Sequence, residues 1–149
     1  MPRNQSERVK PFGPFEPWPR GSNTAEAEVE HLVGHTLTKI EGAEAGDHEV
    51  IFHLKDATFK MYHEQDCCEN VSLDDVIGDI KDLIGSPLTM AEVVCGDDEE
   101  LHKPQREGSG DSHTWTFYKF ATVKGYVTLR WYGESNGYYS EEVYFVRIK

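Results

Sequence analysis

The amino-acid sequence predicts an α+β domain in which an antiparallel β-sheet of six to seven strands is packed by one main helix. Three observations support this class. Short segments rich in β-branched and aromatic residues alternate with turn residues, which is typical of strands. Residues 72–84 carry apolar side chains at helical spacing. The 149-residue chain is long enough to bury the core of one domain.

The first 23 residues form a Pro-rich arm ahead of the predicted domain, which spans residues 24–149. Five of the seven prolines lie in this arm. Because proline fixes φ and lacks an amide donor, the arm favours neither helix nor sheet. Phe12, Phe15 and Trp18 stand between the prolines. The arm is therefore either a flexible tail or a docking arm whose aromatic side chains anchor on a partner.

Two helices are predicted. Residues 72–84 form the main one, because Ser72 can cap its N-terminus and Gly85 can end it. Its apolar residues would share one stripe: Leu73, Val76, Ile77, Ile80, Leu83 and Ile84. Residues 24–33 predict a shorter helix, which Gly34 would end in a left-handed conformation.

Seven strands are predicted from partial alternation of apolar and polar residues between turns. They span residues 37–41, 49–54, 58–62, 88–95, 114–123, 126–133 and 142–148. Residues 96–112 are polar, contain glycine and show no hydrophobic periodicity. This segment is therefore predicted to be an acidic mobile surface loop.

Charge and composition exclude several classes of function. The net charge is -12, and an acidic protein repels phosphate backbones, so general nucleic-acid binding is not expected. No apolar run is long enough for a membrane helix, and the N-terminus lacks the apolar core of a signal peptide. Three cysteines form no disulfide framework. The expected setting is a reducing cytoplasm, and the acidity leaves room for partners that carry basic surfaces.

The last third of the chain holds eleven of the 17 aromatic residues. If Lys124 and Gly125 form a two-residue turn, Lys119 and Arg130 oppose each other across two strands. The face they share would also hold Trp115, Phe117, Tyr126 and Tyr132. Rings beside cations suit a nucleotide-like ligand. A three-residue bulged turn would separate the cations instead, and acidic neighbours could neutralise them.

No motif predicts catalysis. Residues 133–137 match the G-x-S-x-G pattern, but no helix and no later histidine follow. Asn136 and Gly137 predict a hairpin turn instead. His63, Cys67 and Cys68 are weak candidates for a metal or redox site, since no second ligand pair stands at a typical spacing. Adjacent side chains also tend to point apart. The sequence therefore predicts a non-enzymatic protein without a cofactor.

Four segments resemble a family of small proteins of unknown function that bacteriophages and prophages mainly encode. They are Met61–Glu69, Ile77–Pro87, Thr114–Thr122 and Arg130–Glu141, and the resemblance spans about residues 32–145. It implies a phage gene acting in or on a bacterial host, in the host cytoplasm or in the virion. It brings no activity and no catalytic residues.

Four functions are compatible with these observations, and the sequence favours the first. A phage accessory protein could bind a host protein, or sequester a nucleotide-like signal on the aromatic face, as anti-defence proteins do. An acidic nucleic-acid mimic could inhibit a basic host enzyme through Asp74, Asp75, Asp79, Asp82, Asp97 and Asp98. A minor virion component could clamp a neighbour with its N-terminal arm. A metal-assisted enzyme could use His63, Cys67 and Cys68. A homo-oligomer is compatible with each.

Overall fold

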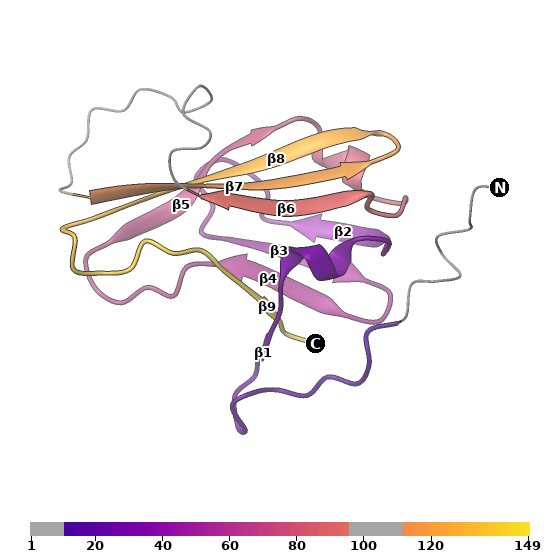
Figure 1. Cartoon of the computed structure of the whole chain (residues 1–149), viewed down its shortest axis with the longest axis horizontal. Coiled ribbons are helices and arrows are strands. Elements are labelled where there is room, and N and C mark those ends of the chain that lie inside the picture. The colour runs from indigo at the N-terminus through magenta and orange to yellow at the C-terminus, as the bar shows by residue number, and fades with distance from the viewer. Residues whose placement is uncertain (1–10, 96–111) are drawn as a thin grey trace.

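Two antiparallel sheets, stacked face to face as a β-sandwich, make up residues 11–95 and 112–149, the part of the chain that this computed structural model describes (Figure 1). The first sheet has the strand order β1-β9-β4-β3-β2 and the second β5-β8-β7-β6. The first comprises β1 (Ala25–Glu26), β2 (Leu37–Glu41), β3 (Glu49–Leu54), β4 (Thr58–Tyr62) and β9 (Tyr144–Arg147). The second comprises β5 (Asn70–Ile77), β6 (Met90–Cys95), β7 (Ser112–Thr122) and β8 (Gly125–Ser135).

The core lies between the two sheets because their strands alternate apolar and polar side chains. In β3, for example, every second residue is fully or almost fully buried. Two contacts tie the layers together. The rings of Phe52 in β3 and Phe120 in β7 lie 5.7 Å apart. The indole Nε1 of Trp131 in β8 donates to the Sδ of Met61 in β4 at 3.1 Å.

The predicted α+β class is wrong, and the main helix predicted at residues 72–84 is absent. Strand β5 occupies the first half of that segment, and the short 3-10 helix η3 (Ile80–Leu83) follows. A bulge between Leu73 and Asp75 shifts the alternation by one residue. Gly78 then ends the strand with a φ of 106°. The bulge and the 3-10 turn together place apolar residues at a spacing that mimics a helix, while pairing with β8 stabilises the extended backbone.

The short helix predicted at residues 24–33 is also wrong. The two-residue strand β1 pairs with β9, and the 3-10 helix η2 (Val29–Leu32) follows it. Val29 and Leu32 are buried, so this segment contributes to the core despite its irregular backbone. Among the described residues, no helix reaches seven residues, and none has the length and apolar character to cross a membrane.

The seven predicted strands are all present, three of them with the predicted bounds. The pairing of β7 with β8 differs from the prediction, because Val123 and Lys124 form the turn, one residue earlier than expected. Arg130 therefore faces Phe117 instead of Lys119. The shift amounts to two residues, which preserves the alternation, so the residues predicted to share a face do share it. The loop predicted at 96–112 lies outside the described residues except for its last position.

Candidate functional site

Within the described residues, the inner face of β6 becomes less covered toward one end of the sandwich. Along this strand the inward-facing Ala91 is buried, Val93 is 40% exposed and Cys95 is exposed. The inward-facing residues of β7 change in parallel from aromatic to hydroxyl-bearing, in the order Phe120, Tyr118, Thr116, Thr114 and Ser112. The apolar core thus passes into a polar, accessible hollow at this end.

Two adjoining pockets, of about 460 and 290 Å³, occupy the opening. They share Val93, Tyr118 and Val143 and together form one groove, which we call the acidic groove. Strands β6 and β7 line one side of it. The β8–β9 connection, which runs from the far end of β8 back to β9 (yellow in Figure 1), and residues 27–30 line the other.

The groove combines an apolar floor with acidic walls. Among the described residues that line it, four are glutamates and none is lysine or arginine: Glu28, Glu30, Glu141 and Glu142. Burial raises the pKa of the Tyr118 phenol, and the neighbouring Cys95, Glu142 and Glu30 raise it further. The apolar lining residues are Ala27, Val29, Val93, Val143 and Phe145. Such a surface suits a ligand that is both cationic and apolar.

Glu141 is the buried carboxylate of this groove. Thr114 Oγ1 donates to its Oε1 at 2.7 Å, and Ser135 Oγ donates to its Oε2. Burial alone would raise the pKa of Glu141, but hydrogen bonds from Ser135, Thr114 and Ser112 outweigh it and lower that pKa. Gly133 permits this close approach, because a Cβ there would lie 3.0 Å from the Cβ of Glu141. The carboxylate is thus held ionised by hydroxyl groups.

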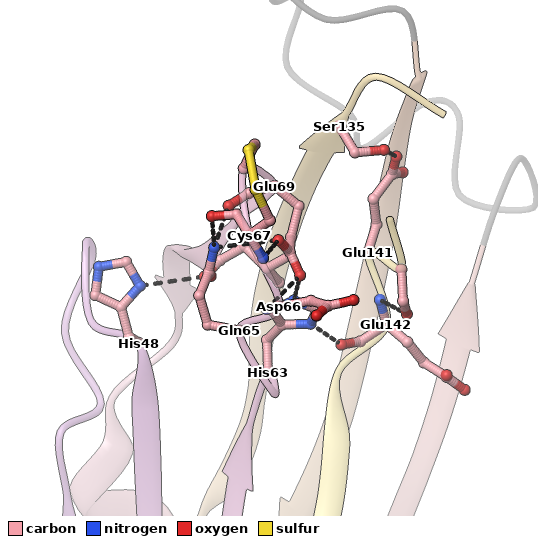
Figure 2. A network of polar contacts seen from close by, with 12 residues as sticks. His48, His63, Gln65, Asp66, Cys67, Glu69, Ser135, Glu141 and Glu142 are labelled. Atoms are coloured by element: carbon pink, nitrogen blue, oxygen red, sulfur yellow. Dashed lines mark hydrogen bonds and ion pairs between the residues drawn. A yellow bond between two sulfur atoms is a disulfide. The ribbon is translucent and has the colours of Figure 1, made fainter. Parts of the chain in front are cut away.

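A second buried carboxylate, Glu69, lies in the β4–β5 connection (Figure 2). Its Oε2 pairs with Nε2 of His63 at 2.7 Å, and both side chains are almost completely buried. The backbone amides of Cys67 and Asp66 donate to it at 2.8 and 3.0 Å. Burial would raise the pKa of Glu69, but these amide bonds and His63 outweigh it and lower that pKa to about 2.

His63 connects Glu69 to the groove. Its Nδ1 lies 2.6 Å from the backbone oxygen of Glu142, which can only accept, so Nδ1 donates. Its Nε2 lies 2.7 Å from Oε2 of Glu69. Both ring nitrogens therefore lie within hydrogen-bond distance of an oxygen, as buried polar groups require. The network in Figure 2 thus runs from the β4–β5 connection to the wall of the acidic groove.

Cys67 and Cys68 are joined by a disulfide, and both side chains are exposed. The expectation that adjacent cysteine side chains point apart is therefore wrong at this position, because the two sulfurs meet. Glu69 stabilises the turn that brings the two cysteines together, because its carboxylate accepts from the backbone amides of Asp66 and Cys67. Cys95, in the groove, is the remaining cysteine and has a free thiol.

The predicted ligand face lies on the outer side of the second sheet. Trp115, Phe117 and Tyr132 form a separate hydrophobic cluster there, with exposed fractions of 4, 1 and 5%. Their burial leaves little ring surface for stacking. Tyr126 lies apart, at the exposed tip of the β7–β8 hairpin. Ligand binding by this face stays a prediction.

The two cations of that face do not oppose each other. The guanidinium Nη2 of Arg130 lies 2.8 Å from Asp74 and 3.4 Å from Asp75, across the bulge of β5, and its Cζ lies 5.7 Å from the centre of the Trp115 ring. Lys119 pairs with Thr128 of β8. The expected alternative, in which acidic residues pair with Lys119 and Arg130, is confirmed for Arg130.

The aspartates predicted to share one helical face are spread over three settings. Asp74 and Asp75 pair with Arg130. Asp79 caps η3 by accepting from the amide of Lys81 at 3.0 Å. The backbone oxygen of Asp82 accepts from the hydroxyl of Thr122. Asp97 and Asp98 lie outside the described residues.

Part of the N-terminal arm packs against the sandwich through Phe12 and Phe15. The ring of Phe12 stacks on His35 at 4.0 Å and meets Phe59 edge-on at 5.0 Å. The guanidinium of Arg147 lies over both Phe12 and Phe15, 5.9 and 5.7 Å from the ring centres. Trp18 is 73% exposed. Two of the three predicted anchors therefore contact the chain's own domain.

Ser135 lies at the end of β8 and accepts from the amide of Gly137, whose φ is 91°. The hairpin turn predicted here is wrong, because β8 extends through Ser135 and the following strand, β9, lies in the other sheet. The chain bends after Ser135 instead, and Gly137 adopts the left-handed conformation there. Within the described residues, no group of three His, Cys, Asp or Glu side chains is placed to hold a metal ion. His63 meets Glu69 and not a cysteine sulfur.

Glu69, Glu141 and Glu142 were not singled out by the sequence. Each is an ordinary glutamate without a motif, and the residues that surround it come from distant parts of the chain. One signal was present for two of them: Glu69 and Glu141 end the segments Met61–Glu69 and Arg130–Glu141, which carry the resemblance described above.

Comparison with known protein families matches residues 30–145 to a domain of unknown function, DUF7448. This match confirms the resemblance to a family of unknown function and covers well over half of the chain. Neither a curated protein nor a solved structure matches.

Proposed function

We propose that this chain, which belongs to the DUF7448 family of domains of unknown function, is a non-enzymatic binding protein that holds a basic segment of a partner protein. The observation that carries the proposal is the acidic groove. Four glutamates and no lysine or arginine line it among the described residues, and its floor is apolar. A segment with alternating cationic and apolar side chains would match both features.

We further propose that the partner belongs to a bacterial host and that the protein serves a bacteriophage or prophage. This setting is supported by the sequence resemblance alone. The nucleotide-binding version receives less support, because Trp115, Phe117 and Tyr132 are buried. The hypothesis of a nucleic-acid mimic also receives less support, because Asp74, Asp75 and Asp79 make separate local contacts.

Selection of binders from a random peptide library tests the proposal. Peptides rich in lysine, arginine and apolar residues should be enriched. Titration calorimetry should then show that Glu30→Lys and Glu142→Lys each weaken binding about fivefold to tenfold, since an exposed interfacial charge contributes on the order of 1 kcal/mol. Both residues are exposed, so the substitutions leave the core intact.

Glu44→Lys is the matched control. Glu44 is exposed in the β2–β3 connection, and neither pocket of the groove includes it. This variant has the same change of charge and should bind like the wild type. Enrichment of neutral or acidic peptides, or equal affinity of all four proteins, would overturn the proposal.

A further inference from the structure

We propose that Cys67 and Cys68 form a thiol–disulfide redox couple and that its oxidation state is transmitted to the acidic groove through Glu69 and His63. The couple itself is independent of what the groove binds. Only the effect on affinity rests on the proposed function.

The couple is accessible to reagents in solution. Both cysteine side chains are exposed in the β4–β5 connection, and their sulfurs are bonded to each other. Disulfide exchange requires a thiolate to reach one sulfur, so exposure decides whether such a bond can react. A small-molecule monothiol of the glutathione class meets that requirement here.

The chemistry is a balanced two-electron exchange. The thiolate of one monothiol attacks a sulfur of the pair, the Cys67–Cys68 bond breaks, and the other cysteine leaves as a thiolate. A second monothiol then attacks the mixed disulfide and releases the oxidised small molecule. In sum, two cysteine thiols form while two monothiols become one disulfide. The reverse reaction uses the oxidised small molecule as the oxidant.

The turn around Glu69 connects the couple to the interior. The amide of Cys67 donates to Oε1 of Glu69 at 2.8 Å, and Gln65 Nε2 donates to the backbone oxygens of Cys67 and Glu69 at 3.2 and 2.7 Å. A disulfide between adjacent residues closes a small ring with their peptide bond and limits the backbone rotation of both. Reduction removes that restraint, so the Cys67 amide no longer stays aimed at Glu69.

The transmission ends at the groove. Glu69 pairs with His63, and His63 donates to the backbone oxygen of Glu142 at 2.6 Å. Glu142 and its neighbours Glu141 and Val143 line the acidic groove. A looser Glu69 therefore loosens the hydrogen bond that holds this wall in place (Figure 2).

Redox titration of the full chain in a glutathione buffer, read by peptide-resolved mass spectrometry, tests the couple. Cys67 and Cys68 should interconvert together between dithiol and disulfide, while Cys95 does not pair with either. Cys95→Ser should titrate identically. If oxidised glutathione forms no Cys67–Cys68 bond, or if the bond resists reduction in the folded protein, the proposal fails.

Hydrogen exchange on the two redox states tests the transmission without any ligand. Reduction should speed amide exchange about tenfold at Asp66, Cys67 and residues 141–143, and leave β3 unchanged. The Cys67→Ser/Cys68→Ser variant should reproduce the reduced state. Equal exchange at 141–143 in both states would overturn the transmission.

Binding measurements separate this inference from the proposed function. A basic peptide selected on the oxidised protein should bind the reduced protein at least about fivefold more weakly. If no basic peptide binds either form, the proposed function fails while the titration and exchange results still stand. If a peptide binds both forms equally, the groove is confirmed and its redox control is refuted.

Discussion

The carboxylate of Glu69 organises the residues around it. It accepts from two backbone amides and from His63, and no solvent reaches it. Four donors converge on it when Gln65 Nε2, at 3.2 Å from Oε1, is included. A carboxylate with this many donors stays ionised in the folded state far below its ordinary range, which links its charge to stability.

Replacing Glu69 should therefore remove an acid-dependent part of the stability. Its folded-state pKa of about 2 is below its ordinary value of 4.5, so the contribution is complete above 4.5 and is lost as the pH falls toward 2. Glu69→Gln should lower the melting temperature by about 10 °C at neutral pH, because it removes the buried negative charge to which His63, Gln65 and two backbone amides are hydrogen-bonded. The difference should shrink in acid. A gap that is constant from neutral pH to pH 2 would contradict this assignment.

The pKa of His35 should depend on whether the ring of Phe12 is packed against it. Burial lowers the pKa of His35, and the Asp56 carboxylate offsets this only in part. The ring of Phe12, stacked at 4.0 Å, supplies part of that burial. Phe12→Ala should therefore raise the pKa of His35 toward 6.5 in an NMR titration and destabilise the protein by about 1–2 kcal/mol. Trp18→Ala is the control, and it should change neither the pKa of His35 nor the stability, since Trp18 is exposed.

At the scale of single elements, the segment 70–84 shows how tertiary pairing overrides a helical pattern. Its apolar spacing fits a helix, but Val71 and Leu73 alternate with exposed or half-buried neighbours as in a strand. Residues from Asn70 to Ile77 pair with β8, and the bulge between Leu73 and Asp75 shifts the register of this pairing. Gly78, near the middle of the predicted helix, was the sequence signal against it.

Substitution of Gly78 distinguishes a strand end from a helix interior. Its φ is 106°, and a Cβ there would lie 2.4 Å from the backbone oxygen of Tyr126. Gly78→Ala should therefore destabilise the protein by at least about 2 kcal/mol in denaturant unfolding. Gly46→Ala, at a φ of 96° with no heavy atom within 4 Å, should cost only about 1 kcal/mol. Stabilisation by Gly78→Ala, as expected inside a helix, would contradict the strand.

The other strands were predictable because their alternation is local. Residues 37–41, 49–54 and 58–62 needed no knowledge of a partner strand. The register of β7 on β8 was not predictable, because the choice between turns at Val123–Lys124 and Lys124–Gly125 depends on contacts with η3. Thr122 in fact donates its hydroxyl to the backbone oxygen of Asp82, which holds the hairpin in its observed register.

At the scale of the whole molecule, the acidic groove exists only because of the sandwich. Its walls come from residues 27–30, 93–95, 112–118 and 137–145, which are separated by long stretches of sequence. No local pattern marks Glu30, Glu141 or Glu142 as members of one surface. The sequence showed an acidic protein but not where its acidity gathers, and the fold places four glutamates around one groove.

Protection of Cys95 from alkylation tests the central claim most directly, because this free thiol lines the groove. With Cys67 and Cys68 oxidised, a saturating basic–apolar peptide should slow alkylation of Cys95 at least about tenfold. At a subsaturating peptide concentration, added salt should weaken this protection, because salt screens the charges of the glutamates. The Glu30→Lys variant should likewise be protected less than the wild type. An alkylation rate unchanged by a peptide that demonstrably binds would place the binding site elsewhere and contradict the account.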